Sequence, residues 1–129
     1  ELLGLSDRQK PLTLYINSAE YSPVFPPEVD EKEIYVAAEP EAGFFEMHHF
    51  YYEWSRFTGK LYIAYGYEKD AVFTVGKDIA VINGKEVRLD KALSLRDGLP
   101  LIPLLLLYDS FGIEYKREGK TLEVTASAN

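Results

Sequence analysis

The sequence predicts an α+β fold in which antiparallel β-sheets curl around short α-helices. Short segments rich in Ile and Val flank turn dipeptides, of which Asn83-Gly84 is the clearest. Apolar residues recur at helical spacing after Pro103. The same order of elements occurs twice along the chain. We therefore expect a single compact domain over residues 1–129, built from two degenerate copies of a strand-hairpin-helix-hairpin unit.

The second copy spans residues 71–127 and begins with a hairpin. Asp78 to Ile82 and Lys85 to Leu89 have strand composition, and Asn83-Gly84 between them tolerates the positive φ values of a type I′ turn. Asp97-Gly98 marks a further turn before the helix.

The helix of the second copy is expected to start at Pro103, where a missing N–H costs nothing. Gly112 suits the left-handed residue that ends such a helix. Spacing of three and four places four apolar residues on one face: Leu104, Leu107, Tyr108 and Phe111. Ile113 to Lys116 and Thr121 to Thr125 then form a closing hairpin, with Leu122 and Val124 on one side.

The first copy, residues 12–66, repeats this order less regularly. Leu14 to Asn17 and Glu20 to Val24 flank the weaker turn Asn17-Ser18, and Ile34 to Ala38 is a further strand. A helix is expected to begin near Pro40. It should continue through aromatic and histidine residues at helical spacing, before a strand over Leu61 to Tyr65: Phe44, Phe45, His48, Tyr51 and Tyr52.

Composition excludes several classes of protein. A net charge of -7 and a pI near 4.8 repel phosphate backbones and anionic lipids, so nucleic acid is not an expected partner. No apolar run approaches the length of about 20 residues that spans a bilayer, so membrane insertion is not expected either. The absence of cysteine excludes disulfides and thiolate metal sites.

Two groups of residues are candidates for metal binding. On the predicted helix, Glu46, His49 and Glu53 lie at i, i+3 and i+7 and share a face, which suggests a small metal-dependent enzyme or metal-binding protein. The alternative is ordinary helix packing with one solvated histidine, because such sites normally need ligands from a second element. An acidic region, from Glu28 to Glu41, is a candidate for Ca²⁺ or simply a solvated loop.

The chain is rich in aromatic residues, with 10 Tyr, 7 Phe and 1 Trp. Aromatic side chains exposed on a sheet form platforms for sugars or peptides, although many of them will lie in the core. Tyr62 alternates with Leu61 and Ile63, so it should face away from them. Five residues are the candidates for such a binding surface: Tyr35, Tyr51, Tyr62, Tyr65 and Tyr67.

No catalytic motif is recognisable, since the chain has no Cys, no Gly-x-Ser-x-Gly, no phosphate loop and no dinucleotide fingerprint. Ser55 and Ser110 have no evident base partner. We therefore expect no catalytic residues, no cofactor and no enzymatic activity.

From Phe73 onward, seven short elements follow a common order and spacing: Val75-Gly76-Lys77, Val81-Ile82-Asn83-Gly84-Lys85, Leu89-Asp90, Asp97-Gly98, Leu101-Ile102-Pro103-Leu104, Phe111-Gly112 and Gly119-Lys120-Thr121. In these elements the chain resembles the copper amine oxidase N-terminal-like domain, a module of secreted and surface proteins of Gram-positive bacteria. Leu99-Pro100 and Leu105 depart from the family pattern, which usually has Arg-Thr and Arg there.

The resemblance implies a non-catalytic stalk or accessory module, extracellular or at the cell surface, although no signal peptide is visible in the chain. Copper and the redox cofactor of the amine oxidases belong to a separate catalytic domain. Cell-wall polysaccharide or neighbouring domains of a parent protein are the expected partners. Homo-oligomerisation through an uncovered sheet edge is a further expectation.

Overall fold

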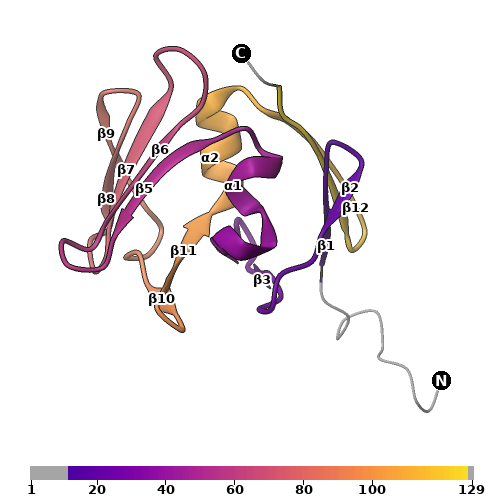
Figure 1. Ribbon diagram of the computed structural model, residues 1–129, viewed down its shortest axis with the longest axis horizontal. Helices are drawn as coiled ribbons and strands as arrows, with labels where there is room; N and C mark the ends of the chain where they lie inside the picture. The colour runs from indigo at the N-terminus through magenta and orange to yellow at the C-terminus, as the bar shows by residue number, and fades with distance from the viewer. Residues whose placement is uncertain (1–11, 128–129) are drawn as a thin grey trace.

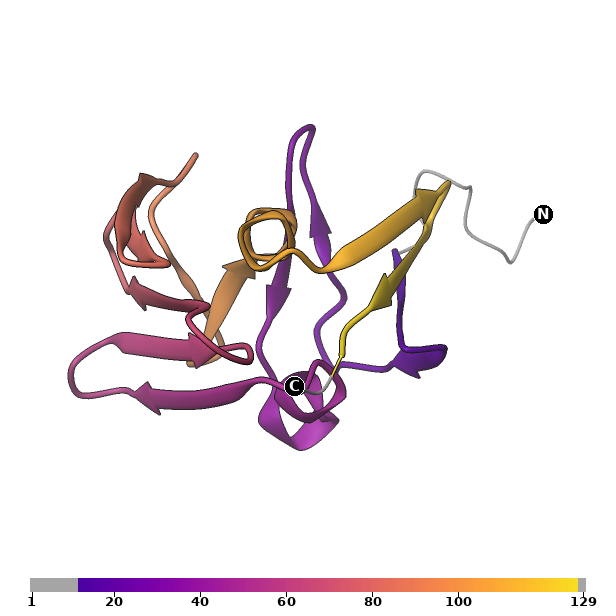
Figure 2. The same cartoon turned by 90° about the horizontal axis from the view of Figure 1, so that it is seen from above.

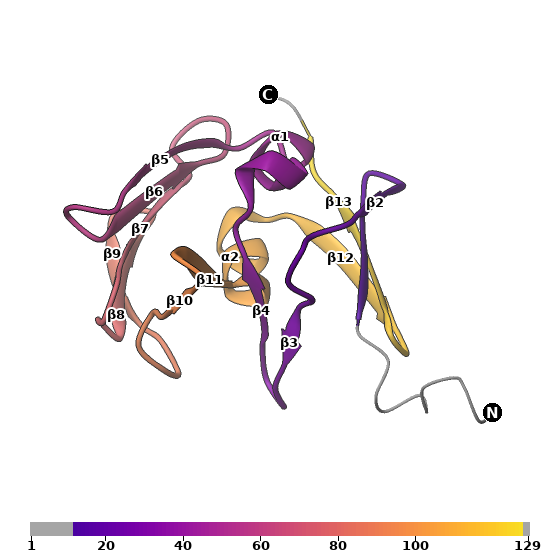
Figure 3. The same cartoon turned by 60° about the horizontal axis from the view of Figure 1, so that its bottom comes forward.

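The computed structural model describes residues 12–127, which form an α+β fold of three β-sheets around a buried helix (Figures 1 and 3). That helix is α2 (Leu104–Phe111), in which Leu104 and Leu107 are fully buried. Within the described residues, no helix is long and apolar enough to cross a membrane.

The first sheet joins the two ends of the described chain in the order β12-β13-β1-β2. Its strands are β1 (Thr13–Ile16), β2 (Ala19–Tyr21), β12 (Glu114–Glu118) and β13 (Thr121–Thr125). β1 runs parallel to β13, with Tyr15 opposite Glu123, and the other pairs are antiparallel. The expectation of antiparallel sheets fails at this one pair, because no turn links β13 to β1 and sets their relative direction.

The second sheet has the order β10-β11-β4-β3. Its strands are β3 (Glu28–Val29), β4 (Ile34–Ala37), β10 (Leu95–Arg96) and β11 (Leu99–Pro103). The central pair is antiparallel, with Val36 opposite Ile102. All four residues of β4 are buried, as expected for a strand covered on both faces.

The third sheet has the order β5-β6-β7-β8-β9 and curls along one side of the molecule (Figures 1 and 2). Its strands are β5 (Tyr51–Ser55), β6 (Lys60–Ala64), β7 (Asp70–Thr74), β8 (Ile79–Ile82) and β9 (Lys85–Arg88). Leu61, Ile63 and Phe73 point into the core and are fully buried. Their neighbours in sequence therefore lie on the outer face.

The helix predicted at the centre of the second copy is confirmed. It begins one residue later than expected, with Pro103 as the extended residue before it, and it ends at Gly112 with φ 71°. The predicted face Leu104, Leu107, Tyr108 and Phe111 is the buried one. Glu33 satisfies the helix N-terminus, because its carboxylate accepts hydrogen bonds from the N–H groups of Leu105 and Leu106 at 2.7 and 3.1 Å.

The helix predicted for the first copy is wrong over its second half. A 3₁₀ turn, η1 (Pro40–Ala42), leads into α1 (Phe44–Met47), which has a single turn. His49 then takes the left-handed conformation, φ 61°, and Tyr51 begins β5. Aromatic residues favour strands. Pairing with β6 provides hydrogen-bond partners for the backbone of this segment, in place of those that a longer helix would have provided. This long-range pairing overrides the helical spacing of the local sequence.

The first hairpin is shorter than expected, since β2 ends at Tyr21 instead of continuing to Val24. Pro23 lacks the N–H that a strand residue donates. The closing hairpin of β12 and β13 is confirmed, with Leu122 and Val124 buried on one side.

The described residues share one hydrophobic core that draws side chains from all three sheets and both α-helices. β1 to β6 with α1, and β8 to β13 with α2, each run through four strands, an α-helix and two strands, and β7 lies at the start of the second segment. The first two sheets each contain strands from both halves, so the segments 12–66 and 71–127 are interleaved. That they are copies of one unit stays a prediction.

Candidate functional site

The outer face of the third sheet brings two predicted tyrosines together. Tyr51 on β5 and Tyr62 on β6 lie with their ring centroids 6.2 Å apart in an edge-to-face arrangement. Glu53 lies directly opposite Tyr62, and Val72 lies opposite it on the other side. We call this surface the tyrosine face and define it by Tyr51, Glu53, Tyr62, Asp70 and Val72.

Both phenols of the tyrosine face donate hydrogen bonds to carboxylates. The Tyr51 hydroxyl donates to Glu53, and the Tyr62 hydroxyl donates to Asp70 at 3.4 Å. The bond to Glu53 raises the pKa of Tyr51, while desolvation and then the charge of Asp70 raise the pKa of Tyr62. Both phenols therefore stay protonated at neutral pH, and the bonds hold the rings in fixed positions.

A hollow of about 430 Å³ opens beside Tyr62. It is lined by Glu53, Trp54, Ser55, Thr58, Lys60, Tyr62 and Val72, of which Tyr62 presents its ring on the outer face while the Trp54 side chain packs against the core. An aromatic wall next to a carboxylate, an ammonium group and hydroxyls fits a ligand with apolar C–H faces and many hydroxyl groups.

The other three predicted tyrosines lie away from this face. Tyr35 is buried to 6% exposure beneath the Lys91 ammonium group, which lies 4.3 Å from its ring centroid. Tyr65 is equally buried and stacks on Phe111. Tyr67 is 88% exposed between β6 and β7, outside the sheet. The sequence does not distinguish the buried tyrosines from the exposed one, because each lies in or next to a strand of mixed composition.

The predicted metal face of Glu46, His49 and Glu53 does not exist as a helix face. Glu46 lies on α1, His49 follows the end of that helix and Glu53 lies on β5. The described residues contain no group of three His, Cys, Asp or Glu side chains that could hold a metal ion. Glu46, His49 and Glu53 therefore do not form such a group.

His48 is instead a buried structural residue. It is fully buried, with Nδ1 2.7 Å from the Phe44 carbonyl and Nε2 2.7 Å from the Tyr108 hydroxyl. Since a carbonyl only accepts, Nδ1 carries the proton and Tyr108 donates to Nε2. Burial lowers the pKa of His48 to about 4. His49 is exposed, in agreement with the expectation of packing with one solvated histidine.

Three carboxylates of the acidic region that suggested calcium have partners within the protein. Glu39 accepts hydrogen bonds from the N–H groups of Val24 and Phe25 at 2.8 and 3.0 Å. Glu28 pairs with Arg96, and Glu33 caps α2. These carboxylates are distributed over separate elements and do not converge on one point.

Sequence reasoning missed Trp54 and Lys60 as residues of the hollow. Because a helix was predicted through Tyr52, no strand was predicted at Trp54. A period of two was available as a signal, because Tyr51 and Glu53 alternate with Tyr52 and Trp54. Read as a strand, this segment places Tyr51 beside Glu53 on one face.

The relation to known proteins rests on one comparison. Neither the curated proteins nor the solved structures contain a match to this chain. The sequence model of the Copper amine oxidase N-terminal domain matches residues 15–126, which include α2 and all three sheets except the first two residues of β1. In copper amine oxidases this N-terminal domain is a non-catalytic accessory domain. The chain belongs to the copper amine oxidase N-terminal domain family.

Proposed function

We propose that the chain is a non-catalytic accessory module, extracellular or at the cell surface, that binds a polysaccharide of the cell envelope through the tyrosine face. Membership of a family of accessory domains supports the non-catalytic role. The resemblance to modules of secreted and surface proteins supports the location.

The observation that carries the proposal is the position of Tyr51, Tyr62 and Glu53 beside the hollow. Tyr51 is 58% exposed, which is a large fraction for an aromatic ring held by a hydrogen bond. Exposed aromatic rings with fixed orientation offer contact area at a low cost in side-chain entropy.

Charge narrows the class of polysaccharide. The net charge of -7 disfavours anionic polymers. Within the hollow, Glu53 supplies an acceptor and Lys60 supplies a donor, so the two charges offset each other locally. An uncharged sugar chain with hydroxyl and amide groups matches this arrangement best.

Sedimentation with insoluble cell-wall polysaccharides and a glycan array test the proposal. We expect wild-type protein to bind neutral polymers and Tyr62→Ala to bind at least about tenfold more weakly, because a central aromatic contact is lost. Tyr67→Ala is the matched control, since it removes an exposed tyrosine outside the tyrosine face.

Lack of binding to every surface polymer would reject the binding role and leave only that of a spacer between domains. Equal binding by wild type and Tyr62→Ala would place the ligand elsewhere on the molecule. Turnover of any substrate by the purified protein would contradict the non-catalytic role. Labelling of intact cells with an antibody to the chain tests the proposed location.

A further inference from the structure

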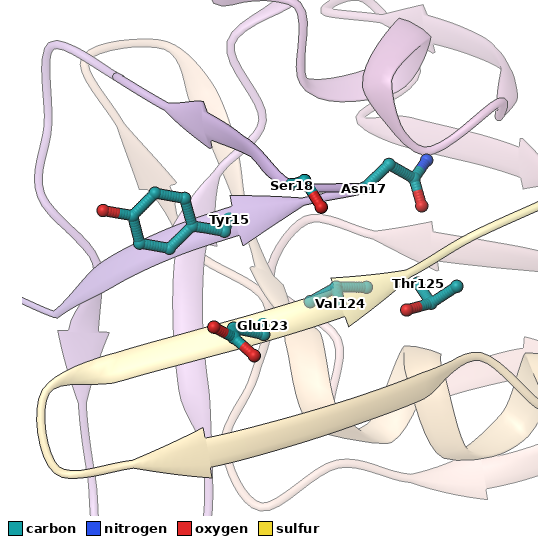
Figure 4. Close-up of a pocket in the computed structure, with 6 residues that line it drawn as sticks. All are labelled: Tyr15, Asn17, Ser18, Glu123, Val124 and Thr125. Carbon is teal, nitrogen blue, oxygen red and sulfur yellow. The ribbon is translucent and has the colours of Figure 1, made fainter.

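A second hollow of about 430 Å³ lies on the outer face of the first sheet, across the parallel pair β1 and β13 (Figure 4). Tyr15 and Glu123 lie directly opposite each other on these strands. Two positions further along the same face, Asn17 and Thr125 are smaller. The step from large to small side chains produces the depression beside the Tyr15 ring.

This hollow repeats the chemistry of the one beside Tyr62. In each hollow a tyrosine ring lies across the strand pair from a glutamate, Tyr15 from Glu123 and Tyr62 from Glu53. Two hydroxyl side chains complete each lining, Ser18 with Thr125 in one and Ser55 with Thr58 in the other. The hollows differ in their cations, since Lys60 lines the hollow of Glu53 whereas Lys116, opposite Glu123 in the strand register, pairs with Glu118 at 3.5 Å.

One wall of the second hollow is fixed in advance. The Asn17 amide donates to the Met47 carbonyl at 3.3 Å and accepts from the Ala126 N–H at 2.9 Å. These bonds tie the turn between β1 and β2 to the end of α1 and to the chain after β13. A ligand therefore meets a surface that needs little ordering on binding.

We infer that this hollow, formed by Tyr15, Glu123, Ser18 and Thr125, is a second subsite for the same uncharged sugar chain. This inference rests on the proposed function of the tyrosine face. The first and third sheets lie at opposite ends of the longest axis of the molecule (Figures 1 and 2). Their inner faces meet the common core, so the two hollows point outward, away from that core.

Two outward subsites make the module bivalent. A short oligosaccharide reaches one subsite at a time, so the protein should bind two of them. A long polymer offers many sites, and one protein molecule then bridges two strands of it. The protein should therefore cross-link polymer strands, and it should bind the polymer more tightly than either subsite binds alone, without any additional contact between protein and sugar.

The test uses the full chain and a neutral probe, the hexamer of N-acetylglucosamine. Titration followed by amide chemical shifts should perturb two separate groups of residues, one around Tyr62 and one around Tyr15. Tyr15→Ala should abolish the second group and leave the first. Glu123→Gln is a milder second variant, expected to weaken the second subsite while the fold is retained.

Light scattering of a soluble neutral polymer such as glycol chitin supplies an independent readout. Wild-type protein should cross-link the polymer, while Tyr15→Ala should bind it without cross-linking. Perturbation around Tyr62 alone would overturn the second subsite and leave the proposed function intact. Perturbation around Tyr15 alone would overturn both bivalency and the role of the tyrosine face. No perturbation at either group would reject binding of this sugar at both sites.

Discussion

Asn17 and Asn83 occupy the same place in the two halves of the chain, the first residue of the turn that follows a hairpin's first strand. Each has a positive φ, 53° and 52°. Each side chain also reaches the helix of its own half, Asn17 through the Met47 carbonyl and Asn83 through the Ser110 carbonyl. Each side chain also accepts a hydrogen bond from a backbone N–H, Asn17 from Ala126 just after β13 and Asn83 from Asp70 at the start of β7. The two halves therefore fasten hairpin to helix in the same way.

The halves differ at the helices that these asparagines hold. α2 has eight residues and ends in a left-handed glycine, Gly112. α1 has four residues, and its left-handed residue after the end is His49. The turn of the second half contains Gly84, whereas that of the first contains Ser18 with φ 71°. The first half thus departs from the regular pattern at each of these points.

The irregular end of the first helix lies where the two halves contact each other. Because α1 stops early, His48 lies against α2 and binds Tyr108 at 2.7 Å. Phe50 then stacks on the His48 ring, with centroids 4.7 Å apart. A longer first helix would carry the chain away from this position. In the first half, a short and irregular helix thus accompanies direct contacts between its His48 and α2 of the second half.

Acid should break the link between the halves and produce the largest effect. The unfolded chain protonates His48 near pH 6.5, whereas burial delays protonation in the folded protein to about pH 4. Acidification between these values therefore favours unfolding and removes about 3 kcal/mol from the free energy of unfolding. Urea denaturation at several pH values measures this loss.

His48→Gln is the variant that isolates the contribution of His48. It should be less stable at pH 7 but should lose less stability on acidification, since it carries no ionisable group. Burial raises the pKa of Glu33, which acts with the opposite sign and adds stability as the pH falls. The difference between wild type and variant cancels this contribution. Identical pH profiles for the two proteins would contradict the role of His48.

The asparagines should show an intermediate effect of similar size in both halves. Asn83→Ala and Asn17→Ala each remove two side-chain hydrogen bonds and place alanine at a positive φ, so each should cost about 2 kcal/mol. Asn83→Gly and Asn17→Gly are the controls, because glycine accepts the backbone conformation but makes neither bond. A loss in one half only would mean that the two turns are not equivalent.

Much of the second half was predictable from sequence, because its signals are local. Asn83-Gly84 specifies a turn type, and Gly112 marks the end of a helix. The segment from Phe44 to Tyr52 was not predictable in this way. Its aromatic residues satisfy the helical period, and only pairing with β6, which lies further along the chain, makes Tyr51 a strand residue. The parallel pair of β1 and β13 is non-local for the same reason.

The candidate site was predictable in part. Alternation along β6 places Tyr62 outward, as the structure shows. The meeting of Tyr62 with Tyr51 and Glu53 depends on the register of β5 against β6, which no local signal gives. Trp54 entered the lining of the hollow only with that register. The sequence thus predicts that aromatic side chains lie on the sheet surface, whereas which of them lie side by side depends on the strand pairing.

Ser18→Gly should give the smallest effect and should make the first turn resemble the second. Ser18 holds φ 71°, a conformation that costs a residue with a side chain about 1–2 kcal/mol and costs glycine little. Glycine loses more conformational freedom on folding, so the net gain should be about 0.5 kcal/mol. Gly84→Ser is the reciprocal change and should destabilise by a similar amount, because the open space around Gly84 leaves only the backbone conformation to oppose a side chain. Urea midpoints of both variants measure the pair. A destabilising Ser18→Gly would mean that the serine side chain stabilises the turn by more than its backbone strain costs, and the two turns would then differ in mechanism as well as in sequence.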